Sequence, residues 1–137
     1  MTQEDKDLLL KDLCARLPYG IKASYYGAEE ECETWDEIEC VTRDGYVDIG
    51  QYSLPIERIK PYLFPLSSMT REQKKYITDK WGINEEFDFE IDTNWGEYFV
   101  ELGDTVDFIN WLNKNHFDIY GLIPMELALD ATNLKIY

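Results

Sequence analysis

The sequence predicts a single compact α+β domain, in which small antiparallel sheets pack against about three helices. Its 137 residues suit one domain. The hydrophobic residues, 45% of the chain, can fill a core without a metal or disulfides. Apolar residues recur at helical spacing in some stretches and alternate in others. Two subdomains are an option within this domain, with a helix and small β-barrel over 1–66 and a helix–hairpin–helix unit over 67–137.

The first predicted helix covers residues 2–17. Thr2 is a suitable N-cap with Asp5 three residues later, and the leucines that follow repeat at helical spacing. Pro18 and Gly20 are expected to end it.

Short strands are predicted over residues 21–66. Runs on either side of Asp44–Gly45 read as a hairpin. Residues 53–66 contain Pro55, Pro61 and Pro65, which favours an edge strand that continues as an extended connector. Four or five such strands could form a small SH3-like barrel.

The second half is predicted as helix, hairpin and helix. Thr70 and Gln73 form a capping box for a helix that stops at Gly82. Alternation in residues 86–92 and 97–102 predicts a second hairpin. A third helix is expected from Asp104 or Thr105, with His116 in its last turn. The tail, residues 121–137, could add one or two strands.

His116 is the chain's only histidine. A position near a helix C-terminus, where the dipole favours a cation, explains it without catalysis. Cys14, Cys32 and Cys40 could complete a zinc site with it, but they lack the short spacings of such sites, so buried free thiols are expected. We therefore predict no metal and no catalytic residue.

The net charge of −15 is unevenly distributed. Residues 51–82 carry three acids and six bases, whereas residues 21–50 carry nine acids and two bases. Direct nucleic-acid binding is disfavoured, because phosphates would be repelled over most of the surface. No apolar run approaches a membrane span and the N-terminus lacks a signal-peptide pattern, so a cytoplasmic protein without membrane contact is expected.

Three blocks of the chain resemble a known family. They are MTQEDKDLLLKDLCARLPYG, IKPYLFPLSSMT and FINWLNKNHFDIYGLI, which together cover roughly a third of the sequence. They are similar to blocks in a family of uncharacterised small proteins from anaerobic gut bacteria and their phages or prophages. The resemblance implies a phage or mobile-element origin and brings no catalytic residues.

The run EEECETWDE concentrates acids without a basic partner. Such a cluster could imitate the phosphates of nucleic acid and block a DNA-binding protein, or it could be a solvated strand edge that deters aggregation. The acids singled out are Glu29, Glu30, Glu31 and Asp36.

Residues 90–101 imitate the spacing of an EF-hand loop, with acids or amides at positions 1, 3, 5 and 12. Trp95 stands where that loop needs glycine, so calcium is not expected.

Aromatic residues beside the predicted turns favour a contact surface. The candidates are Trp35, Tyr46, Tyr52 and Trp95. The sequence therefore predicts a non-enzymatic accessory protein that binds an unidentified protein partner through an acidic surface dotted with aromatics, without a cofactor. The alternatives are the nucleic-acid mimic and a small hydrolase that uses carboxylates.

Overall fold

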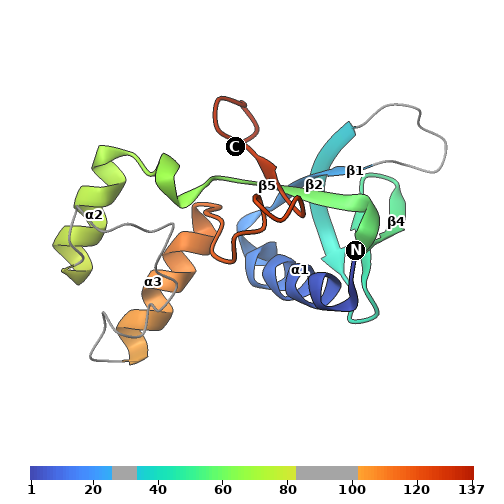
Figure 1. Cartoon of the computed structure of the whole chain (residues 1–137), viewed down its shortest axis with the longest axis horizontal. Coiled ribbons are helices and arrows are strands. Elements are labelled where there is room, and N and C mark those ends of the chain that lie inside the picture. The colour runs from blue at the N-terminus through green and yellow to red at the C-terminus, as the bar shows by residue number, and fades with distance from the viewer. Residues whose placement is uncertain (26–33, 83–101) are drawn as a thin grey trace.

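The computed structural model describes residues 1–25, 34–82 and 102–137, with side chains from residue 106 onward in the last range. Its strands form one mostly antiparallel sheet of six, in the order β4-β3-β2-β1-β5-β6; one helix packs against this sheet and two more lie to one side of it (Figure 1). This confirms the predicted α+β class. The strands are β1 (Lys22–Tyr25), β2 (Thr34–Val41), β3 (Tyr46–Ile49), β4 (Tyr52–Pro55), β5 (Ile59–Leu63) and β6 (Leu129–Asp130).

The sheet is open, so the described strands do not close into the barrel that the sequence suggested. Strands β4 and β6 are its two edges. The hairpin between β2 and β3 is confirmed: Gly45 turns the chain with a φ of 87°, and its amide donates to the carbonyl of Thr42.

The expected edge strand in residues 53–66 is confirmed as β4, but the expected extended connector after it is instead an interior strand. The segment divides into β4, a short 3₁₀ turn (Ile56–Arg58) and β5, and β5 pairs with β1 on one side and β6 on the other. Pro61 is nevertheless tolerated inside this sheet. The short β6 pairs only with Tyr62 and Leu63, so it does not need a hydrogen bond from Pro61.

The three helices begin and end largely where the sequence places them. Helix α1 (Gln3–Arg16) has the capping box of Thr2 and Asp5, and a 3₁₀ turn then leads to left-handed Gly20. Helix α2 (Arg71–Trp81) has the capping box of Thr70 and stops at left-handed Gly82. Helix α3 (Leu102–Lys114) begins earlier than predicted.

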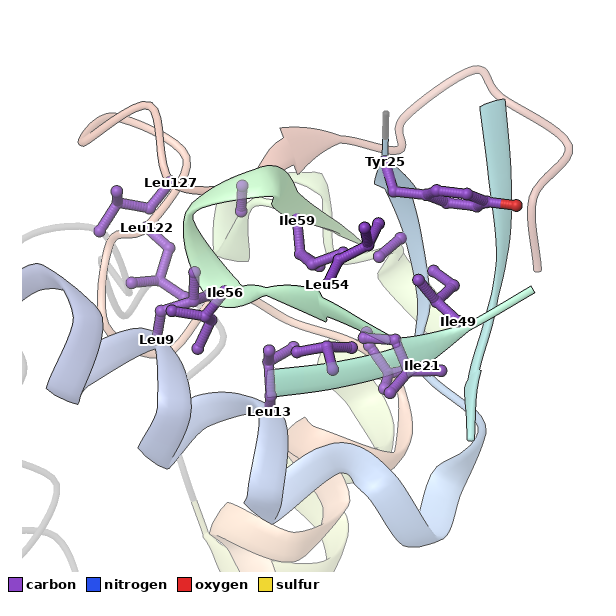
Figure 2. Close-up of a cluster of buried hydrophobic side chains, with 14 of the residues drawn as sticks. Leu9, Leu13, Ile21, Tyr25, Ile49, Leu54, Ile56, Ile59, Leu122 and Leu127 are labelled. Carbon is purple, nitrogen blue, oxygen red and sulfur yellow. The ribbon is translucent and has the colours of Figure 1, made fainter. Parts of the chain in front are cut away.

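Two hydrophobic clusters hold these elements together. The larger one joins α1, the inner face of the sheet and the C-terminal segment, through side chains such as Leu13, Ile49 and Leu122 (Figure 2). The smaller one joins α2 and α3 around Ile77, Phe108 and Leu112. Helices α2 and α3 lie to one side of the sheet (Figure 1).

Two sequence predictions concern residues outside the described part of the chain. The second hairpin, predicted over 86–92 and 97–102, lies outside it except for Leu102, which is the first residue of α3 rather than strand. The EF-hand-like residues 90–101 also lie outside it. Within the described residues, no helix is long and apolar enough to span a bilayer.

Candidate functional site

The exposed side of the sheet is the first candidate surface. Strand β2 has a neighbour on each side, yet five of its eight residues are exposed. Side chains alternate along a strand, so Trp35 and Glu37 face away from buried Ile38. Ile38 and Ile49 point to the inner face of the sheet, toward the core. We call the other side of the sheet the outer face.

Trp35 is the largest exposed side chain on this face. It is paired with Ser24 of β1, which is buried, and the ammonium of Lys22 lies 5.5 Å from the centre of the indole ring. The exposed fraction of Trp35 is 46%. A tryptophan held by a strand and a lysine, with half its surface in water, presents a preformed apolar contact area.

Tyr46 lies on the same face at the opposite end of the β2–β3 hairpin. It pairs with Pro55, and its neighbour Val47 is buried on the inner face, so Tyr46 points outward with 49% of its surface exposed. Asp48 follows on the same face, opposite Cys40. The outer face thus combines two exposed aromatics with carboxylates.

The other predicted residues do not join this surface. Asp36 is exposed but alternates with Trp35, so it lies on the opposite side of β2. Tyr52 pairs with Ile49 on the inner face and packs against Tyr25, with ring centres 6.0 Å apart. The remaining candidates, Glu29, Glu30, Glu31 and Trp95, lie outside the described residues.

A second candidate is a hollow of about 340 Å³ beside His116, which we call the His116 recess. It opens where the start of α2, the end of α3 and the last residue, Tyr137, meet. Its walls combine aromatic rings, hydroxyls, amides and one ammonium. The lining residues are Phe64, Ser68, Thr70, Gln73, Lys114, Asn115, His116, Phe117 and Tyr137.

His116 occupies a different place from the one predicted. Helix α3 ends at Lys114, and His116 follows in the left-handed region with a φ of 62°. Its carbonyl accepts from the amide of Phe64, while the amide of Asp118 donates to the carbonyl of Phe64. These two hydrogen bonds join the segment after α3 to the segment after β5. Because His116 has this left-handed backbone, the helix does not continue through it.

The imidazole is buried and neutral. It stacks on Tyr137, with ring centres 3.7 Å apart and planes inclined by 11°. Burial, followed by the charges of Arg16 and Lys22, lowers the pKa of His116 from 6.5 to about 4. The predicted explanation, a cation favoured by the helix dipole, is therefore wrong: the imidazole carries no charge at neutral pH.

Tyr137 covers His116 because its hydroxyl is anchored. The hydroxyl donates to the carbonyl of Tyr62 (2.8 Å) and accepts from the amide of Lys22 (3.0 Å). Burial is the main cause that raises the pKa of the Tyr137 phenol. The phenol hydroxyl of Tyr137 therefore stays protonated over a wide pH range, and the ring stays stacked on His116.

Behind the recess lies a buried ion pair that sequence reasoning missed. Arg16 and Asp12, one turn apart in α1, are fully buried and joined by two hydrogen bonds of 2.8 and 3.0 Å. Arg16 also donates to the carbonyl of Phe117. Burial, opposed by Arg16, raises the pKa of Asp12. The available signal was an Asp–Arg pair at i, i+4 beside the apolar residues of α1.

Among the described residues, the His116 recess lacks carboxylates. None of the residues that line the His116 recess is acidic, and no group of three potential metal ligands occurs in this part of the chain. Cys14 and Cys40 are free but exposed, which corrects the prediction of buried thiols. Cys32 lies outside the described residues.

A smaller hollow of about 170 Å³ lies between the first turns of α1 and the β2–β3 turn. Acidic and basic side chains both line it, and Lys6 and Glu57 there form an ion pair. Because it is half the volume of the His116 recess and is partly neutralised by this ion pair, the outer face and the His116 recess remain the stronger candidates.

No protein-family model, curated protein or solved structure matches the chain.

Proposed function

We propose that this protein is a non-enzymatic accessory protein that binds a basic protein through the outer face. The observation that carries the proposal is an interior strand, β2, whose outward side chains Trp35 and Glu37 are left in water, while Ile38 on the other side joins the core. The sequence blocks that resemble phage and prophage proteins favour a role in a phage or another mobile element.

Charge selects the class of partner. Residues 34–55, which include β2, β3 and β4, contain five acids and one base. On the outer face itself, Glu37 and Asp48 contribute carboxylates from β2 and β3, whereas Lys22 and Lys60 contribute ammonium groups from β1 and β5. A basic partner surface would be steered toward the β2–β3 part of this face and would gain complementary contacts there.

Trp35 supplies the apolar anchor. Interface binding energy concentrates in a few large side chains, with tryptophan and tyrosine prominent among them. Trp35 is already oriented by Ser24 and Lys22, so it would lose little conformational entropy when a partner covers it. Tyr46 would extend the contact to the other end of the hairpin.

The test is affinity purification from a host lysate, followed by measured binding of the identified partner. Trp35→Ala should weaken binding at least 10-fold, because the anchor is lost. Tyr120→Ala is the matched control: Tyr120 is also an exposed aromatic beside a lysine, Lys11, but it lies away from the outer face. Equal affinities of the two variants would contradict the proposal.

The dependence of the measured affinity on salt, and competition by DNA, then identify the class of partner. Charge complementarity predicts that affinity falls as salt rises, and that Glu37→Gln with Asp48→Asn flattens this dependence. Competition by duplex DNA would show that the partner is a DNA-binding protein and would support the nucleic-acid mimic. A salt-independent complex would contradict the basic partner.

A further inference from the structure

We propose that the His116 recess binds a small organic oxyanion, a carboxylate or phosphate carried on an apolar or aromatic body. This site is separate from the outer face and does not depend on the proposed protein partner. Its volume, about 340 Å³, lies within the range of about 300–1,000 Å³ that small-molecule pockets occupy.

The charge of the recess favours an anion. In a chain with a net charge of −15, the described residues that line this hollow include Lys114 and no acid. The N-terminus of α2 also lies at the recess, since its cap residue Thr70 and the third helical residue Gln73 are both in the wall. The amides of the first turn carry the positive end of the helix dipole.

The capping box of α2 satisfies only some of the backbone amides in its first turn. The amide of Gln73 donates to the Thr70 hydroxyl oxygen, and the amide of Thr70 donates to the Gln73 side chain. The amides of Arg71 and Glu72 precede the first intrahelical bond and have no acceptor within the helix. The side chain of Glu72 is in this turn but does not line the recess.

His116 provides the independent sign of a ligand. Only 8% of the residue is exposed, and its buried Nδ1 has no hydrogen-bond partner among the described residues. A buried polar atom without a partner is costly, and a functional site is one of its explanations. Nδ1 is covered in this structure, where Tyr137 stacks on the ring, so a ligand in the recess would reach this atom only if the Tyr137 ring moved aside.

The remaining walls suit an apolar body. Phe64, Phe117 and Tyr137 line the same hollow, and Phe64 packs against both of the other rings, with ring centres 6.4 and 5.9 Å away. An aromatic group could stack here while its anionic substituent faces Lys114 and the start of α2. The ligand class is therefore an amphipathic anion rather than an inorganic ion.

The test uses phenyl phosphate and benzoate as probes, with benzamide as the uncharged analogue, in NMR titrations of the full chain. We expect at least one anion to shift the amide signals of residues 70–73 and 114–117 at millimolar concentration, with at least 10-fold weaker binding of benzamide. The stronger of the two anions identifies the preferred group.

Variants locate the site. Lys114→Gln should weaken the binding of the anion at least 5-fold, whereas Lys75→Gln, an exposed lysine on α2 away from the recess, should leave it unchanged. Absence of shifts with either anion at 20 mM, shifts centred elsewhere, equal binding of benzamide, or equal effects of the two lysine variants would each overturn the proposal.

Discussion

Replacement of Arg16 with methionine is expected to lower the free energy of unfolding by about 3–5 kcal/mol at pH 7. Methionine fills much of the same space, but it leaves the Asp12 carboxylate without its partner in a fully buried position. It also removes the bond to the carbonyl of Phe117, which joins α1 to the segment after α3. Urea denaturation followed by circular dichroism gives the value, and Arg43→Met, at an exposed arginine, should change it by no more than about 0.5 kcal/mol.

A double variant separates the charge from the packing. Asp12→Leu with Arg16→Met removes both charges, so we expect it to be more stable than Arg16→Met alone, although it still lacks the Phe117 bond. The deficit of Arg16→Met should also shrink as the pH falls, because protonation of Asp12 removes the unpaired charge. A double variant as unstable as the single one would show that the bond to Phe117, rather than the ion pair, carries the effect.

Local chemistry made much of the fold predictable from the sequence. Thr2 and Thr70 are followed at the third position by Asp5 and Gln73, and such boxes fix helix starts through contacts within four residues. Asp44–Gly45 fixed the hairpin in the same way, because glycine accepts the positive φ that the turn requires. In each case the residues that determine the structure are neighbours in the chain.

The recess and the sheet order depend on contacts between distant residues, and this is why they were not predicted. His116 leaves α3 because Phe64, more than fifty residues earlier, binds its carbonyl. The burial of Arg16 is partly compensated by a third hydrogen bond, to the carbonyl of Phe117, about a hundred residues later. Pairing of β5 with β1 likewise makes a proline-containing segment part of the sheet interior. No pattern of spacing in the sequence records these partners.

Only part of the outer face was predictable from the sequence, because strand register also depends on distant residues. Trp35 and Tyr46 lie near predicted turns, and both are exposed on one face of the sheet. Tyr52, near a turn, and Asp36, in the acidic run, point to the other side, because the register of β2, β3 and β4 decides the face of each side chain. Proximity to a turn predicts exposure better than it predicts a shared surface.

Replacement of His116 with asparagine is expected to reduce the acid sensitivity of the fold. The native imidazole has a pKa of about 4, and the unfolded one has the ordinary value of 6.5. Between these values the unfolded chain binds a proton that the native chain does not, so stability present at pH 7 is lost as the pH falls. The loss at pH 4.5 is at most about 2.5 kcal/mol, and smaller where water reaches the ring.

Asparagine is the appropriate substitution because it tolerates the left-handed backbone at this position and does not titrate. Unfolding free energies of both proteins at pH 7 and pH 4.5 should therefore show the wild type losing more stability than the variant. All carboxylates are common to the two proteins, so their titration largely cancels in the comparison. An equal loss in both would mean that His116 does not account for any of the acid sensitivity.

The cause of the low pKa can be tested directly, since the chain has a single histidine and its imidazole gives one set of NMR signals. Burial is the largest cause and the charge of Arg16 is secondary. Tyr137→Ala, which removes the ring stacked on the imidazole, should therefore raise the pKa of His116 toward 6.5 more than Arg16→Met does. The reverse order would show that the positive charge of Arg16, and not the cover provided by Tyr137, keeps His116 neutral.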